Sequence, residues 1–297
     1  MRLILWLLLP AALMGGEHPW ARHAIDSSSR GADGVRLADV NGDGLLDIAT
    51  GWEEGGRVRA YLNPGAGKAK QPWPSVTVGE VGSPEDAVFV DLDGDGAWDV
   101  VSSTEGKQRT LFVHWAPPEP GRYLDPDAWR TEAIPASVEL GMWMFVTPAD
   151  IDGRNGPDLF AGSKNEQAKI GWWEAPEDAR ELNAWIWHPL YDAGWIMSLI
   201  EHDMDGDGDP DLVATDRKGP NSGILWIENP SRRVHRIGTV GEEELMFMKM
   251  ADLDGDGESE AVAATLSGPI VRYRREGDGW RRYEVARPPE VTRGKAV

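Results

Sequence analysis

A nine-residue acidic loop recurs five times along this chain, and its spacing limits the folds that the chain can adopt. The copies read DVNGDGLLD (39–47), DLDGDGAWD (91–99), DIDGRNGPD (150–158), DMDGDGDPD (203–211) and DLDGDGESE (252–260). Their first aspartates are separated by 52, 59, 53 and 49 residues. A period of this length is typical of propellers and solenoids. The sequence therefore predicts an array of similar units rather than one irregular domain.

Each loop has the composition of a cation site. In the fourth copy, five carboxylates fall within nine residues, and without a positive ion among them they would repel one another. Gly206 and Gly208 allow the backbone to curl so that the oxygen atoms converge. Oxygen ligands at positions 1, 3, 5 and 9, with a backbone carbonyl near position 7, suit Ca²⁺ better than Mg²⁺. We therefore expect these loops to bind calcium.

The predicted calcium ligands are the side chains at these four positions of each loop. They are Asp39, Asn41, Asp43, Asp47, Asp91, Asp93, Asp95, Asp99, Asp150, Asp152, Asp158, Asp203, Asp205, Asp207, Asp211, Asp252, Asp254, Asp256 and Glu260. In the third loop, Arg154 stands at position 5, where the other copies carry aspartate. Three alternatives follow: this loop binds calcium weakly, Asn155 completes its ligand set, or the Arg154 guanidinium serves as an internal cation.

An EF-hand shares the opening of this pattern, but the rest of the motif excludes it. An EF-hand requires a bidentate glutamate at position 12 and a helix on either side. Position 12 is instead Thr50, Ser102, Ala161, Ala214 or Ala263 in the five copies. The flanking segments 35–38 and 47–50, or 87–90 and 99–102, are short apolar runs typical of strands. The ion is therefore expected in a tight connection between two strands.

Repeated D-x-[DN]-G-D-G-x-x-D loops between short apolar strands resemble the VCBS and FG-GAP-type repeats of secreted, calcium-binding β-propellers, whose relatives form the integrin α-subunit head. The resemblance covers roughly residues 20 to 285. Phe-Gly and Gly-Ala-Pro signatures are absent from the repeats, which favours the VCBS subtype. The resemblance implies an all-β propeller with calcium loops between the first and second strands of each blade, and four to five structural Ca²⁺ ions.

Strand patterns around the loops predict five four-stranded blades. An aromatic stretch closed by proline marks the third strand, and a tryptophan five residues before an aliphatic residue marks the fourth. Tryptophans at these repeated positions are expected to pack between blades. One extra copy of the fourth-strand pattern, residues 20–25, precedes the first loop and is expected to pair with the last blade. Six or seven blades would require units that have lost the motif.

The ends and the composition predict an exported protein. Residues 1–16 are typical of a signal peptide and too short to span a bilayer, so we expect a secreted or periplasmic bacterial protein without a transmembrane segment. Residues 17–286 are expected to form one propeller, and 287–297 a flexible tail. With no cysteine, metal ions would replace disulfides as cross-links. The net charge of −20 argues against a nucleic-acid partner, and a monomer is expected.

A ligand site is expected on the face opposite the calcium loops, where the connections before each first strand and after each second strand meet. These connections carry charged residues of both signs and two tryptophans outside the repeated positions. The predicted ligand-binding residues are Trp143, Trp195, Glu53, Arg57, Asp86 and Asn221. The weaker candidates for catalysis are Lys164, Arg217, Lys218 and Tyr191.

Three functions are compatible with this pattern. The first is a non-catalytic binding or scaffold module for an extracellular ligand, with polysaccharide as one candidate. The second is a carbohydrate-active enzyme, either a polysaccharide lyase or a sugar dehydratase. No nucleophile elbow, zinc triad or phosphate loop supports an enzyme, so the first hypothesis is favoured. Adhesion, the third, rests on analogy of fold alone.

Overall fold

The computed structural model describes residues 21–238 and 244–287, which form five four-stranded antiparallel sheets. The sheets are β1–β4, β5–β8, β9–β12, β13–β16 and β17–β20, each with its strands in chain order. This arrangement confirms the predicted all-β, five-bladed propeller, and the sheets are called blades 1 to 5 below. The four 3₁₀ helices of the described residues have three residues each, so none of them could cross a membrane.

The elements have the following bounds. The strands are β1 Ala32–Ala38, β2 Asp47–Trp52, β3 Arg57–Tyr61, β4 Ser75–Glu80, β5 Pro84–Val90, β6 Asp99–Thr104, β7 Leu111–Trp115, β8 Arg130–Ala133, β9 Met142–Ala149, β10 Asp158–Lys164, β11 Lys169–Glu174, β12 Ile186–Asp192, β13 Ile196–His202, β14 Asp211–Asp216, β15 Gly223–Ile227, β16 Val234–Ile237, β17 Leu245–Ala251, β18 Glu260–Thr265, β19 Ile270–Glu276 and β20 Gly279–Val285. The helices are η1 Pro120–Arg122, η2 Pro126–Ala128, η3 Pro135–Ser137 and η4 Leu182–Ala184.

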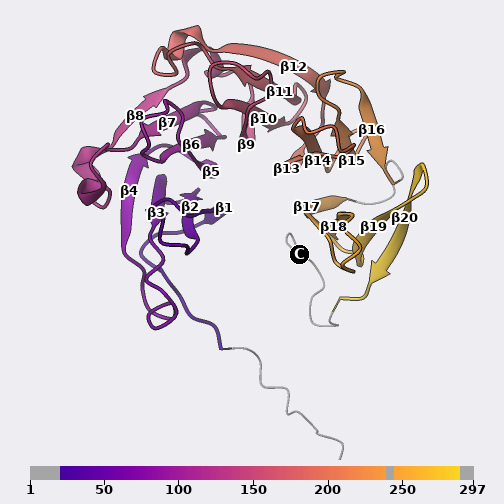
Figure 1. Ribbon diagram of the computed structural model, residues 1–297, viewed down its shortest axis with the longest axis horizontal. Helices are drawn as coiled ribbons and strands as arrows, with labels where there is room; N and C mark the ends of the chain where they lie inside the picture. Colours follow the sequence, from indigo (N-terminus) through magenta and orange to yellow (C-terminus); the bar gives the residue numbers. More distant parts are fainter. Residues whose placement is uncertain (1–20, 239–243, 288–297) are drawn as a thin grey trace, which may run out of the picture.

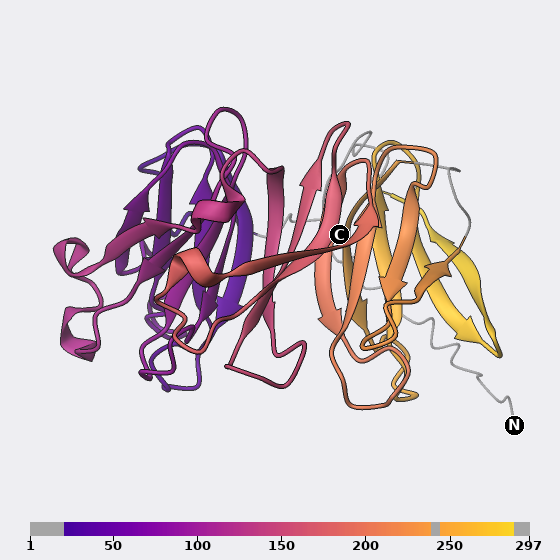
Figure 2. The ribbon, with the colours of Figure 1, turned by 90° about the horizontal axis from the view of Figure 1, so that it is seen from above.

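The blades follow one another around a ring that is open between blade 5 and blade 1, as Figure 1 shows. The first strand of each blade lies nearest the centre and the fourth lies at the outside. Seen from above in Figure 2, the strands run between two faces on which the connecting loops gather. The acidic loops join first to second strands and therefore share one face, called the calcium-loop face. The opposite face holds the connections that lead into first strands and out of second strands, and it is called the polar face.

Every blade has a register shift near the start of its first strand. In blade 2 it falls between Pro84 and Asp86, and in blade 4 between Ile196 and Ser198. Blades 1, 3 and 5 carry the corresponding irregularity. An extra residue in one strand bends it and redirects the neighbouring side chains. These shifts lie beside the polar face, and they change which side chains of the first strand point to the centre of the ring.

The core consists of apolar clusters between successive blades. Trp115 of blade 2 and Trp173 of blade 3 are 2 % and 0 % exposed and belong to one such cluster. Corresponding clusters join blades 1 and 2, blades 3 and 4, and blades 4 and 5. The prediction that tryptophans at repeated positions pack between blades is confirmed at Trp129 and Trp185, which are also buried. A fully buried aromatic side chain removes a large apolar area from water, so these contacts hold the ring together.

The expected closure by residues 20–25 is wrong for the part of that segment that the structure describes. The last sheet contains β17–β20 alone. The carbonyl oxygen of Ile25 instead accepts a hydrogen bond from the Trp73 backbone N–H in blade 1. The carboxylate of Asp26 then pairs with Arg59 and accepts a hydrogen bond from the Tyr61 hydroxyl at 2.8 Å. The segment therefore covers blade 1. The predicted signal peptide and most of the tail lie outside the described residues.

Candidate functional site

The acidic loops are pre-organised by their own backbone. In the fourth loop, the carboxylate of Asp203 accepts hydrogen bonds from the backbone N–H groups of Gly206 at 2.7 Å and Gly208 at 3.1 Å. Both glycines have positive φ, 82° and 93°, a conformation that residues with a side chain rarely adopt. The first carboxylate in the other loops accepts the same kind of bond. The sequence pattern thus fixes the curl that brings the side chains together.

The ninth residue of each loop ties it to the end of the third strand. Asp211 is 0 % exposed, and its two carboxylate oxygens accept hydrogen bonds from the N–H groups of Met204 and Asn229, both at 2.8 Å. Asp47, Asp99 and Asp158 make the equivalent pair of bonds. In the fifth loop, Glu260 accepts one such bond and pairs with Arg272 instead of a second N–H group. The ninth carboxylate therefore has a structural role as well as a possible place in the ligand set.

Four of the loops bring carboxylate oxygens within 4.8 Å of one another, close enough to share one ion. Two oxygens that each lie about 2.4 Å from one calcium ion can be at most about twice that distance apart. The groups are Asp91, Asp93 and Asp99; Asp150, Asp152 and Asp158; Asp203, Asp205 and Asp211; and Asp252, Asp254 and Asp256. The first loop, which has Asn41 at position 3, is not among them. All the donors are hard oxygen atoms, as calcium requires.

The second loop gives the clearest sign that a cation fits. The Oδ1 atom of Asp91 is buried and has no hydrogen-bond partner among the described residues. An orphaned buried carboxylate oxygen costs free energy, and a cation beside it would supply the missing partner. Burial also raises the pKa of Asp99 to about 7, with a further contribution from the charges of Asp93 and Asp95. A bound cation would favour the charged form of this carboxyl group.

Arginines already contact three of the five loops. Arg180 approaches Asp93 in the second loop to 2.5 Å. In the fifth loop, Arg272 lies 2.8 Å from Asp254, and Arg274 lies 2.6 Å from Asp256. Among the described residues, no basic side chain forms an ion pair with the first or the fourth loop. The loops therefore differ in how much of their negative charge the protein itself neutralises.

In the third loop, the contacts of Arg154 favour one of the alternatives left by its unusual sequence, whereas weak calcium binding stays a prediction. The Arg154 guanidinium binds the Asp152 carboxylate at 2.5 Å and Glu174 at 2.9 Å, so it acts as an internal cation. The side-chain amide of Asn155 instead donates to the carbonyl oxygen of Ala175 at 3.0 Å. Burial raises the pKa of Asp158 in this loop to about 6. The loop keeps its curled shape while one of its carboxylates is already paired.

On the polar face, three of the four predicted catalytic residues gather around one tryptophan. The Nζ atoms of Lys164 and Lys218 lie 4.8 and 4.7 Å from the centre of the Trp195 ring, and the Arg217 guanidinium carbon lies 5.0 Å from it. Cations over an aromatic face are attracted by its electron density. Three cations already lie close to the Trp195 ring, and stacking of a sugar ring on Trp195 stays a prediction.

Lys164 also connects the tryptophan to an acidic cluster that the sequence did not reveal. Its ammonium group lies 3.5 Å from Glu85 and pairs more closely with Glu105. Oxygens of Glu53, Glu85 and Glu105 lie within 4.8 Å of one another. Burial raises the pKa of Glu85 to about 7, although the charge of Lys164 opposes the rise. Lys164, Glu53, Glu85 and Glu105, called the Lys164 cluster below, come from three blades, and no local spacing in the sequence brings them together.

Two predicted ligand-binding residues are buried, so those predictions are wrong. Trp143 is 1 % exposed, its ring packs edge-on against Trp187 at 5.2 Å, and its indole N–H donates to the Ser137 carbonyl oxygen. Asp86 is 0 % exposed and holds the guanidinium of Arg36. Both residues belong to first strands, and the irregular start of those strands turns their side chains inward.

The remaining predicted residues lie apart from the Lys164 cluster. The hydroxyl of Tyr191, in outer strand β12, accepts a hydrogen bond from Arg236 at 2.6 Å. Arg57 lies 3.8 Å from Glu80 within blade 1. Asn221 is exposed, and its backbone carbonyl oxygen accepts a hydrogen bond from Arg236. Of the predicted ligand set, only Glu53 and Trp195 join the catalytic candidates.

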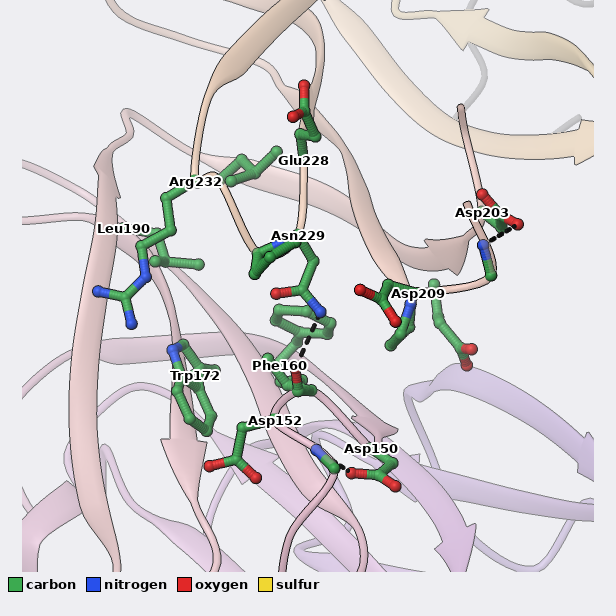
Figure 3. A pocket seen from close by; sticks show the side chains of 17 residues that line it. Asp150, Asp152, Phe160, Trp172, Leu190, Asp203, Asp209, Glu228, Asn229 and Arg232 are labelled. Atoms are coloured by element: carbon green, nitrogen blue, oxygen red, sulfur yellow. Dashed lines mark hydrogen bonds between the residues drawn. The ribbon is translucent and has the colours of Figure 1, made fainter. Parts of the chain in front are cut away.

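A cavity of about 660 Å³ opens on the calcium-loop face between blades 3 and 4. Figure 3 shows Asp150 and Asp152 on one side of it and Asp203 and Asp209 on another, with Trp172 and Arg232 facing them. Asn229 joins the two sides, because its amide donates to the Ile151 carbonyl oxygen at 2.8 Å. Asn229, Pro230 and Arg232 follow strand β15, in a segment for which the sequence predicts no function.

Part of the chain matches a known protein family. Residues 39–102, which hold the first two acidic loops and the strands between them, match the FG-GAP-like repeat. No curated protein matches the chain. The predicted resemblance is confirmed over these residues, whereas the preference for the VCBS subtype stays a prediction.

Proposed function

We propose, from the premise that residues 39–102 carry an FG-GAP-like repeat, that the protein is an exported, calcium-binding β-propeller that serves as a binding module for an extracellular carbohydrate. The repeated acidic loops support the calcium part of this proposal, because their oxygen-only donor sets have the spacing that one ion needs. The fold itself does not decide the ligand, since propellers carry many unrelated functions. The ligand must be argued from the site.

The observation that carries the proposal is the position of the cavity in Figure 3. The first carboxylates of two neighbouring acidic loops, Asp150 and Asp203, both line it. A calcium ion in either loop would supply coordination positions for the hydroxyl groups of a sugar. The chain adds polar groups from Glu228, Asn229 and Arg232, and apolar contact from Leu190. Saccharides combine hydroxyl groups with apolar ring faces, and this lining offers both kinds of contact.

The proposed site differs from the one expected from the sequence. On the polar face, Lys164 already contacts both Trp195 and Glu105. The cavity between blades 3 and 4 is instead open to solvent, and acidic side chains line it. Calcium would therefore serve two purposes in the same place. It would hold the loops in shape, and it would complete the surface that the ligand contacts.

A polysaccharide panel tests this proposal through the melting temperature in calcium and in chelator. Arg232 has a positive φ of 60°, so Arg232→Asn is the suitable variant because asparagine tolerates that conformation. Arg122→Asn, on an exposed arginine outside the cavity, is the matched control. We expect at least one polysaccharide to raise the melting temperature in calcium only, with a smaller rise in Arg232→Asn. A rise that persists in chelator and in Arg232→Asn would contradict the proposed site.

The polar face supports a second candidate, a carbohydrate lyase. The observation in its favour is that Lys164 lies beside Glu85, a buried carboxyl group whose pKa is about 7. Groups that titrate near neutral pH suit proton transfer. In this alternative, Lys164→Ala and Lys218→Ala would abolish the ultraviolet absorbance of an unsaturated product. Turnover that survives both substitutions would exclude these residues as catalysts.

A further inference from the structure

The centre of the ring contains a cavity that none of the proposed functions uses. It measures about 290 Å³ and is lined by first strands, among them β1, β9, β13 and β17, which lie nearest the centre in Figure 1. Its volume is close to the lower end of the range for small-molecule sites, about 300 Å³. It is separate from the acidic loops and from the Lys164 cluster, neither of which contributes a lining residue.

Two cations line this cavity, and only one of them has an acidic partner among the described residues. The Arg36 guanidinium donates to both carboxylate oxygens of Asp86, with its shortest bond at 2.7 Å. Lys249 forms no ion pair within the described part of the chain. Its side chain is exposed and lines the cavity. Partial burial and the charge of Arg36 lower the pKa of Lys249, although the charge of Asp86 opposes this shift. An anion beside Lys249 would relieve that electrostatic cost.

The rest of the lining is apolar and aromatic. The rings of Phe145 and Phe247 meet edge-to-face with their centres 6.0 Å apart. The guanidinium carbon of Arg36 lies 5.6 Å from the centre of the Phe145 ring, which holds the cation against the aromatic wall. Leu199 and Ile200 complete this wall from β13. An apolar group that entered here would remove both its own surface and the aromatic surfaces from water.

The cavity lining also carries a negative charge. Asp33 lies three residues before Arg36 on β1, on the other side of an irregularity in the pairing of β1 with β2. The charge of Asp33 also acts on Glu85, which belongs to the polar face. Because Arg36 is paired with Asp86, Lys249 is the lining cation left for a ligand, and Asp33 is the lining carboxylate that a ligand would meet. A ligand with one carboxylate suits this lining, whereas a second carboxylate would be repelled by Asp33.

We propose that this central cavity binds a small monocarboxylate that carries an aromatic or other apolar group. Its carboxylate pairs with Lys249 close to Arg36, and its apolar body contacts Phe145 and Phe247. This proposal is independent of the carbohydrate site, because the two cavities share no lining residue. A charge-assisted hydrogen bond to Lys249 contributes about ten-fold or more in affinity.

The test uses ligand-observed ¹⁹F NMR on the full chain in calcium buffer, with 3-(4-fluorophenyl)propanoate and its neutral amide as paired probes. We expect the carboxylate to bind, and the amide to bind about ten-fold more weakly. A dicarboxylate of similar size should compete poorly, and Asp33→Asn should improve its competition. Absence of binding by the carboxylate, or equal binding of carboxylate and amide, would overturn the proposal without any variant.

Lys249→Met then locates the site. We expect it to weaken carboxylate binding by about ten-fold while leaving amide binding unchanged, because methionine keeps the length of the side chain without its charge. Lys68→Met, on an exposed lysine of the β3–β4 connection, is the matched control and should change neither affinity. An affinity for the carboxylate that is the same in Lys249→Met and in the wild type would contradict the proposal.

Discussion

The guanidinium of Arg180 lies 2.5 Å from a carboxylate oxygen of Asp93, although 87 residues separate them along the chain. Arg180 belongs to blade 3 and Asp93 to the acidic loop of blade 2. The guanidinium carbon also lies 4.5 Å from the centre of the Trp115 ring. A side chain of one blade therefore supplies positive charge to the predicted cation site of its neighbour.

Arg180→Gln should raise the calcium affinity of the second loop. The substitution removes a positive charge that would repel the ion at short distance, while glutamine keeps hydrogen-bonding capacity. The measurement is the calcium concentration that gives half of the full rise in melting temperature. We expect that concentration to fall in Arg180→Gln and to stay unchanged in Arg122→Gln, whose partner Asp125 lies outside the loops. A higher concentration in Arg180→Gln would show that the arginine assists binding.

Asp205→Ala should destabilise the protein in calcium more than Asp152→Ala. In the fourth loop no basic side chain of the described residues neutralises the carboxylates, whereas Arg154 already pairs with Asp152 in the third loop. An ion that binds only the folded state at a hundred times its dissociation constant adds about 2.7 kcal/mol of stability. Urea unfolding with and without chelator measures the difference between the variants. Equal losses would mean that Arg154 does not weaken the third loop.

Asp86→Ala should cost about 3–5 kcal/mol of unfolding free energy, because it leaves the charge of Arg36 inside the ring without its partner. The pair is only 23 % and 0 % exposed at its two side chains. The matched control is Asp192→Ala, which removes the exposed partner of Lys169 and should cost less than about 1 kcal/mol. Urea unfolding at neutral pH compares the two. A loss in Asp86→Ala no larger than the control would show that solvent reaches Arg36.

Glu85 should make stability depend on pH in a defined window. Folding raises the pKa of Glu85 from 4.5 to about 7, so between these values the folded protein binds more protons there than the unfolded chain. Its contribution to stability therefore falls as the pH rises through this window and is constant above it. Glu85→Gln should remove this slope, gaining roughly 2 kcal/mol relative to the wild type between pH 5 and pH 8. A difference between the two proteins that is the same at both pH values would contradict the shift.

The fold could be predicted because its signals are local and repeated. In the loop that begins at Asp203, every turn-forming glycine and every candidate ligand lies within nine residues. The strands on either side follow from short apolar runs. The five-fold recurrence of the acidic loop favours a ring of similar blades. The same local character explains why the internal role of Arg154 was among the alternatives derived from the sequence.

The site could not be predicted to the same extent, because it depends on contacts between blades. The burial of Trp143 results from an irregular strand start and from packing against Trp187, which follows 44 positions later in the numbering. The Lys164 cluster joins residues of separate blades, and the contact of Arg180 with Asp93 crosses a blade boundary. Residue spacing within one repeat carries no information about such contacts.

Equilibrium dialysis against calcium, followed by elemental quantification of the metal in the protein, tests the central claim most directly. We predict that the wild-type chain retains calcium in several equivalents, and that Asp205→Ala loses about one of them because its fourth loop lacks a ligand. The same calcium content inside and outside the dialysis membrane would contradict the claim that these acidic loops are calcium sites.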